Sequence, residues 1–175
     1  MSKAIFLDRD GVLNEVKLED GKPYPPGSID QLFLLPRVTD ALYLLKNLGY
    51  LLIVVTNQPD VQRGKIKKET VEIINESLSK LLPLDDIYTC YHSDNENCNC
   101  RKPKPGSILD AAIKYNINLQ ESFMVGDRWR DVEAGENAGC RTFFIDYEYK
   151  EKRPKNYTYK VKSLYDAAMI ISEIS

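Results

Sequence analysis

The chain has 175 residues, of which 43% are hydrophobic and 29% are charged. This length and composition suit an ordinary globular protein, and we expect one domain over residues 1–175. The formal net charge of -2 and the lack of a basic stripe argue against a protein that binds nucleic acid through phosphate neutralisation. The longest apolar runs, such as 50–55, are of strand length and too short to span a bilayer.

The amino terminus leads directly into a predicted strand at 4–7, without a charged segment followed by a long apolar run. A secretory signal needs both features, so we expect a cytoplasmic protein, in which disulfides are rare. We also expect a monomer that has neither a nucleic acid nor a membrane as its partner.

The first half of the chain alternates between apolar runs and amphipathic segments. A strand at 5–7 is followed by a polar, proline-rich segment at 14–30. Apolar residues at helical spacing predict helices at 37–48 and 68–82. Between these helices, the run at 51–55 is apolar on both faces, which is typical of a central parallel strand.

The second half of the chain continues the alternation. In order, we predict a strand at 87–91, a helix at 107–115, a strand at 123–125, a helix at 130–138 and a strand at 142–145. The charged, tyrosine-rich segment 148–160 is predicted to be a surface connection, and Ser163 is predicted to cap a last helix. This alternation predicts an α/β fold, a Rossmann-like doubly wound parallel sheet with helices on both faces.

Polar side chains follow several predicted strands at the point where each strand ends. Asp8-Arg9-Asp10-Gly11 follows the first strand, Thr56-Asn57-Gln58 the second, and Gly126-Asp127 the strand at 123–125. In an open α/β sheet the ligand site lies beyond the carboxyl ends of the strands. We therefore expect these side chains to converge on one crevice, together with the basic pair Arg101-Lys102.

The predicted crevice meets the needs of phosphoryl transfer, which requires an in-line nucleophile and cations around the non-bridging oxygens. A carboxylate is a competent covalent nucleophile, and Mg²⁺ takes hard oxygen ligands. Asp8 and Asp127 are the candidate carboxylate ligands of magnesium. Asp10 can act as a general acid and then as a base toward water. Thr56 can donate to a phosphoryl oxygen, and Lys102 can offset its charge.

Each of these residues also has a simpler interpretation. Asp-x-Asp-Gly motifs occur in calcium loops and turns. Thr56 could be an ordinary strand-end hydroxyl, and Lys102 a solvated surface charge. Asp127 could cap the next helix, and Asp131 could orient Lys102 instead of binding a metal. All of these motifs occur together, in this order and at the ends of strands, which favours the catalytic interpretation.

The motifs together resemble the haloacid dehalogenase-like phosphatase superfamily. The residues that carry this resemblance are Asp8-Arg9-Asp10-Gly11-Val12, Thr56, Lys102, Gly126-Asp127 and Asp131. The resemblance implies Asp8 as the nucleophile and Asp10 as the acid and base. It also implies Thr56 and Lys102 as phosphate contacts. The implied magnesium ligands are Asp8, Asp127 and the backbone carbonyl of Asp10.

A second cluster combines three of the four cysteines with the single histidine. Cys90, His92, Cys98 and Cys100 form two pairs, and the loop between them can fold back so that both pairs meet one ion. Cys₃His is a common structural Zn²⁺ set that leaves no position open for water. The alternative is a group of buried free thiols beside a surface histidine. Cys140 stands apart and is expected to be a small buried hydrophobe.

The cysteine cluster leads directly into Arg101-Lys102, so a bound zinc ion would aim both cations at the phosphate. This segment, with Thr56-Asn57-Gln58 and Arg63-Gly64, resembles the D-glycero-D-manno-heptose 1,7-bisphosphate phosphatase family. The same zinc loop occurs in the related histidinol-phosphate phosphatases. The resemblance implies zinc at the Cys₃His set. The substrate contacts that we predict are Asn57, Gln58, Arg63, Arg101 and Arg128.

We therefore predict a magnesium-dependent phosphatase that removes the C7 phosphate of the heptose bisphosphate through an aspartyl-phosphate. Its partner would be a small phosphorylated sugar, whose second phosphate explains the use of several arginines. The alternative enzyme is a histidinol-phosphate phosphatase, whose cationic substrate needs an acidic partner such as Asp60 or Glu15. The alternative outside enzymes is a module that binds a phosphorylated ligand without turnover.

The insertions between the motifs are too short for a separate cap domain. We expect three loops to shape the site instead, at 15–27, 59–64 and 90–102. An open site of this kind suits a small or medium substrate that is recognised by charged contacts.

Overall fold

The computed structural model describes residues 1–175 and contains a six-stranded sheet in the order β5-β4-β1-β6-β7-β8. Every neighbouring pair of strands in this sheet is parallel. The strands are β1 (Lys3–Leu7), β4 (Tyr50–Asn57), β5 (Asp86–Cys90), β6 (Phe123–Gly126), β7 (Arg141–Ile145) and β8 (Tyr159–Val161). The predicted α/β fold with a parallel sheet is confirmed.

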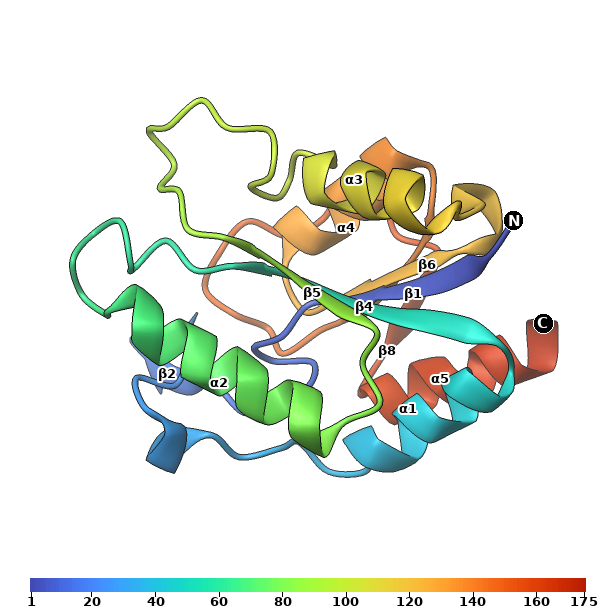
Figure 1. Ribbon diagram of the computed structural model, residues 1–175, viewed down its shortest axis with the longest axis horizontal. Helices are drawn as coiled ribbons and strands as arrows, with labels where there is room; N and C mark the ends of the chain where they lie inside the picture. The colour runs from blue at the N-terminus through green and yellow to red at the C-terminus, as the bar shows by residue number, and fades with distance from the viewer.

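Helices cover both faces of the sheet (Figure 1). One face carries α1 (Val38–Asn47), α2 (Lys68–Leu81) and α5 (Leu164–Ile174), and the other carries α3 (Gly106–Tyr115) and α4 (Trp129–Ala138). Alternate residues of β1 enter the two cores: Ile5 and Leu7 pack with the first helix set, and Ala4 and Phe6 with the second. Because both faces are buried, this strand is apolar from Ala4 to Leu7.

The central strands bring the predicted motifs to one edge of the sheet. β1 lies between β4 and β6, so the residues that follow these three strands are neighbours. Asp8 follows β1, Thr56 lies near the end of β4, and Asp127 follows β6. Figure 1 shows the loop after β5 at this edge and both chain ends at the other. The crevice predicted from strand ends is therefore present.

The residues predicted to end one helix and to begin another do so in the structure. Gly49, with φ of 84°, follows α1 in the left-handed conformation that glycine adopts at little cost. Ser163 caps α5 by accepting a hydrogen bond from the backbone N–H of Asp166 at 3.1 Å. Cys140 is buried, as expected for a thiol outside the cysteine cluster. No helix in the structure combines the length and the apolar character that crossing a membrane requires.

Three regions differ from the prediction. The proline-rich segment after β1 contains an antiparallel hairpin of β2 (Lys17–Glu19) and β3 (Lys22–Tyr24), followed by the short helix η1 (Ile29–Gln31). β8 begins within the last two residues of the segment 148–160 that we predicted to be a surface connection, so that prediction was wrong there. A further short helix, η2 (Leu119–Glu121), precedes β6. All these elements are only three residues long, too short to produce a periodic pattern.

Candidate active site

The centre of the site is a buried lysine that joins two carboxylates. The Nζ atom of Lys102 lies 2.8 Å from Oδ1 of Asp8, 2.6 Å from Oδ1 of Asp131 and 2.6 Å from the carbonyl oxygen of Val55. These three acceptors match the three donors of an ammonium group. Lys102 is only 2% exposed, so the surface-charge interpretation is wrong.

A third carboxylate, that of Asp127, completes the cluster. Ligand oxygens of Asp8, Asp127 and Asp131 all lie within 4.8 Å of one another. Burial and the nearby charge of Asp131 raise the pKa of Asp8 to about 6. Burial and the charge of Asp8 raise the pKa of Asp127 well above its ordinary value. Burial alone would lower the pKa of Lys102, but Asp131 and Asp8 raise it above its ordinary value.

This donor set fits a divalent cation. Three carboxylates lie together, Lys102 pairs with only two of them, and Oδ1 of Asp127 is buried without a hydrogen-bond partner. A buried acceptor of this kind costs free energy unless something pairs with it. Mg²⁺ prefers oxygen ligands, and in proteins it usually binds about one or two carboxylates, with water or phosphate oxygens at its other positions. Asp131, expected to orient Lys102, does contact it and also lies within reach of the same ion.

Asp10 is held by hydrogen-bond donors on several sides. It accepts from Nε2 of Gln58 at 2.7 Å, from Nδ2 of Asn14 at 3.0 Å and from Nε of Arg9 at 3.1 Å. Arg9 is fully buried, and its Nη1 donates to Asn75 on α2 at 2.8 Å. The carboxylate therefore has a fixed orientation. No role was predicted for Arg9 and Asn14, because their importance depends on tertiary contacts.

The end of β4 supplies supporting contacts. Gln58 donates from Nε2 to Oγ1 of Thr56 at 2.9 Å as well as to Asp10. Asn57 donates to the carbonyl oxygen of Lys102 at 3.0 Å and accepts from its N–H at 3.1 Å. The lysine is thus fastened to the strand that carries Thr56. Asn57 and Gln58 line the cavity, whereas Thr56 lies buried behind them.

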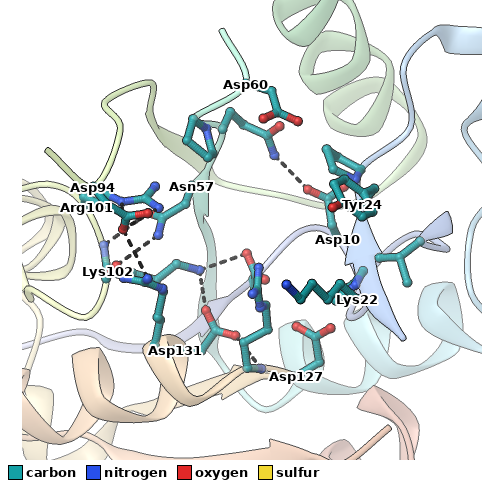
Figure 2. Close-up of a pocket in the computed structure, with 18 of the residues that line it drawn as sticks. Asp10, Lys22, Tyr24, Asn57, Asp60, Asp94, Arg101, Lys102, Asp127 and Asp131 are labelled. Carbon is teal, nitrogen blue, oxygen red and sulfur yellow. Dashed lines mark hydrogen bonds and ion pairs between the residues drawn. The ribbon is translucent and has the colours of Figure 1, made fainter. Parts of the chain in front are cut away.

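A polar cavity opens above this cluster (Figure 2). Nineteen residues line it and only two of them are hydrophobic, which suits a charged, hydroxylated ligand and not an apolar one. All three predicted loops contribute residues, and those from the first loop include Lys22 and Tyr24 of the hairpin. In Figure 2, the Lys22 side chain extends into the space between Asp10 and Asp127. This lysine was not among the predicted site residues.

Three arginines gather on one carboxylate at the side of the cavity. Oδ1 of Asp94 lies 3.0 Å from Nη2 of Arg101 and 3.1 Å from Nη2 of Arg130, and Oδ2 lies 3.4 Å from Nη2 of Arg63. Arg101 also donates to the carbonyl oxygen of His92 at 3.2 Å. Two of the three predicted arginines therefore lie together. Arg130 joins them, although the sequence gave no signal that singled it out.

The third predicted arginine, Arg128, lies apart from this group. Its Nε donates to both carboxylate oxygens of Glu151 at 3.0 Å, and Arg128 itself lines the cavity. Two residues before Glu151, the hydroxyl of Tyr149 donates to Oδ2 of Asp127 at 2.8 Å. Burial and the charge of Asp127 raise the pKa of Tyr149 above its ordinary value. The segment after β7, predicted to be only a surface connection, therefore contacts the site.

The cysteine cluster is assembled as expected for a metal site. Ligand atoms of Cys90, His92, Cys98 and Cys100 all lie within 4.8 Å of one another. A Zn–S bond of about 2.3 Å puts two sulfurs of a tetrahedron about 3.8 Å apart. The Sγ atoms of Cys90 and Cys98 are 3.8 Å apart, and Nδ1 of His92 lies 3.3 Å from Sγ of Cys100. The Sγ atoms of Cys90 and Cys100 are only 3.0 Å apart, so this pair would have to separate to hold the ion. The four side chains thus supply a ligand set that could hold zinc.

Comparison with known proteins supplies the family. A sequence model of haloacid dehalogenase-like hydrolases matches residues 26–139, which is more than half of the chain. The chain belongs to the haloacid dehalogenase-like hydrolase family. The match begins after Asp8 and Asp10, which line the same cavity as Asp127 in the structure.

Two relatives of this haloacid dehalogenase-like hydrolase are curated as D-glycero-beta-D-manno-heptose-1,7-bisphosphate 7-phosphatases. The protein from Helicobacter pylori (strain ATCC 700392 / 26695) is 39% identical over 162 residues, which cover 89% of this chain and 90% of the relative. The protein from Pasteurella multocida (strain Pm70) is 36% identical, with 98% and 97% covered. The similarity thus extends over nearly the whole of each chain.

A solved structure agrees with the fold. The D,D-heptose 1.7-bisphosphate phosphatase from B. bronchiseptica, complexed with magnesium and phosphate, superposes with a TM-score of 0.85 at 28% identity. The alignment covers 99% of both chains. The architecture of this hydrolase is therefore that of a heptose bisphosphate phosphatase along its full length.

Proposed function

We propose that the protein is a magnesium-dependent phosphatase that hydrolyses the C7 phosphate of D-glycero-D-manno-heptose 1,7-bisphosphate. The observation that carries this proposal is the buried cluster of Asp8, Asp127 and Lys102 at the carboxyl edge of the sheet. The relatives support the substrate, because they are named for this reaction over nearly the same length of chain. Residues 1–175 are proposed to act as one domain.

In the first chemical step, a carboxylate oxygen of Asp8 attacks phosphorus in line with the leaving oxygen. The bond between phosphorus and the C7 oxygen breaks, and Asp10 donates its proton to that oxygen. The products of this step are the free sugar 1-phosphate and a phosphoryl group on Asp8. Lys102, which already contacts Asp8, offsets the charge on the transferred group.

In the second step, Asp10 accepts a proton from a water molecule as the water oxygen attacks phosphorus. The bond to the Asp8 oxygen breaks, and inorganic phosphate leaves. Gln58, Asn14 and Arg9 keep the Asp10 carboxylate in one orientation through both steps. Magnesium, held by Asp8, Asp127 and the carbonyl oxygen of Asp10, would supply charge neutralisation at the phosphoryl oxygens.

The second phosphate of the substrate is assigned to the arginines around Asp94. Arg63, Arg101 and Arg130 pair with Asp94, and Arg63 also pairs with Asp60, so three positive charges against two negative ones leave a net positive charge for an anion. Guanidinium groups bind phosphate through paired hydrogen bonds. Asn57, Gln58 and Arg128 are proposed to complete the substrate contacts. The cytoplasmic location and the monomeric state expected from the sequence stay predictions.

A comparison of substrates tests the proposed function. With Mg²⁺ present, we expect kcat/KM for the heptose 1,7-bisphosphate to exceed that for fructose 1,6-bisphosphate and histidinol phosphate. Phosphorus NMR of the product should show the phosphate that is retained on C1. A preference for histidinol phosphate by about tenfold or more would contradict the proposal. That outcome is not expected, because Asp60, the candidate partner for a cationic substrate, is already paired with Arg63 at 3.2 Å.

Arg101 provides a test of the second phosphate site. Because a hydrogen bond to a charged group contributes about 1.5–3 kcal/mol, Arg101→Ala should raise KM for the bisphosphate by about tenfold or more. KM for p-nitrophenyl phosphate, which lacks a second phosphate, should change little. Lys114→Ala is a suitable control, since this exposed lysine pairs with Asp86 at the opposite edge of the sheet. An equal rise in KM for both substrates would show that Arg101 acts on the reacting phosphate instead.

A further inference from the structure

The segment that follows β7 is tied to the active site at three points. The hydroxyl of Tyr147 donates to the carbonyl oxygen of Gly11 at 3.0 Å, and the N–H of Lys150 donates to the carbonyl oxygen of Gly21 at 2.9 Å. Glu151 accepts two hydrogen bonds from Arg128 at 3.0 Å. These contacts join the segment to the loop after β1, the hairpin and the start of α4. The segment therefore has a fixed position beside the cavity.

Between these anchors, Tyr149 contacts Asp127 directly. Its hydroxyl donates to Oδ2 at 2.8 Å, while Oδ1 of the same carboxylate is buried without a hydrogen-bond partner. Gly11 packs against the same group so closely that a Cβ atom there would lie 2.0 Å from Oδ2. One carboxylate oxygen is thus fixed by a hydrogen bond and by packing, and the other has no protein partner.

We infer that Tyr149 is a positioning residue that orients the Asp127 carboxylate for a divalent cation. This inference rests on the proposed magnesium-dependent function, in which Asp127 is a ligand. Partners that hydrogen-bond to a metal ligand fix its orientation, and their loss commonly weakens metal affinity by about 10- to 100-fold. Without this hydrogen bond, the carboxylate would lose rotational freedom when the cation binds, and that loss would weaken binding. The hydrogen bond from Tyr149 fixes the carboxylate before the cation arrives.

The decisive variant is Tyr149→Phe, which removes the hydroxyl and keeps the ring that packs 5.5 Å from Tyr147. Titration calorimetry with MgCl₂, without any substrate, should give a Kd that is about 10-fold or more above that of the unsubstituted protein. Tyr157→Phe is the matched control, because the Tyr157 ring packs against Phe144 away from the carboxylates. The control should bind Mg²⁺ as the unsubstituted protein does.

Thermal unfolding gives a second measurement on the same proteins. Because a ligand that binds only the folded state raises Tm, Mg²⁺ should raise Tm less for Tyr149→Phe than for the control at equal concentration. Comparison without Mg²⁺ separates a loss of fold stability from a loss of metal affinity.

The outcomes separate the inference from the function on which it rests. An unchanged or lower Kd for Mg²⁺ in Tyr149→Phe would overturn the positioning role, and a lower Kd would mean that the hydroxyl competes with the cation. If the unsubstituted protein itself binds no Mg²⁺, the proposed function and this inference fall together. A higher Kd for Mg²⁺ in Tyr149→Phe, with an unchanged Kd in the Tyr157→Phe control, supports both the positioning role of Tyr149 and the magnesium site of the proposed function.

Discussion

Replacing Asp8 with Asn is expected to lower the rate of phosphate release by at least about 10⁴-fold, on the scale found when a nucleophile is removed. The amide of Asn cannot form the acyl-phosphate bond, and the other contacts of the site stay in place. A 10⁴-fold loss corresponds to about 5 kcal/mol of transition-state stabilisation. The measurement is steady-state turnover of p-nitrophenyl phosphate with Mg²⁺, with Asp110→Asn on the exposed side of α3 as the control.

The same variant should keep its fold. Burial and the neighbouring carboxylates raise the pKa of Asp8 to about 6, which shows that its negative charge is disfavoured there. A neutral side chain of the same size removes this repulsion, so Tm should not fall. Substantial activity in Asp8→Asn would rule out Asp8 as the nucleophile. Unsubstituted protein without Mg²⁺-dependent activity on any phosphate ester would favour the binding-module alternative.

Replacing Cys98 with Ser is expected to remove bound zinc and to lower activity by about 10²-fold, because small displacements of positioning groups have costs of this size. The loop between Cys90 and Cys100 would lose its metal anchor, and Arg101 and Lys102 follow directly. The variant should remain folded, since Asn57 still binds the backbone of Lys102 through two hydrogen bonds. The effect should therefore be local.

Elemental analysis provides the measurement for the zinc site. Purified unsubstituted protein should contain zinc in a ratio near one per chain, and Cys98→Ser should contain little. Cys140→Ala is the matched control, because this buried thiol lies outside the cluster and should leave the zinc content unchanged. Full activity in protein that contains no zinc would show that the cysteine cluster has no metal-dependent role.

The main sheet and its catalytic edge could be predicted from the sequence because their signals are local. The apolar runs of β1, β4 and β6 are buried on both faces, so each run marks a central strand without knowledge of its neighbours. The polar residues that follow them must then meet at one edge. Asp8, Asp127 and Lys102 do lie together at this edge, and their catalytic roles stay predictions. The Cys₃His set was found in the same way, from ligand type and spacing alone.

The rest of the site could not be predicted, because it depends on contacts between distant segments. Tyr149 and Asp127 are neighbours only because the segment after β7 folds back over the start of α4. Asp94 gathers Arg63 and Arg101 from two loops and Arg130 from the first turn of α4, and no sequence pattern indicates that the three meet. The hairpin that carries Lys22 has strands of only three residues, too short for an alternating pattern.

The most direct test of the account is a search for the phosphoryl group on Asp8. Asp10→Asn should release p-nitrophenol, a leaving group that needs no acid, in a burst equal to the enzyme concentration, because the second step lacks its base. Mass spectrometry of the acid-quenched protein should then find one phosphoryl group on the peptide that contains Asp8. Steady release of p-nitrophenol with no phosphorylated peptide would contradict the covalent mechanism and the role assigned to Asp8.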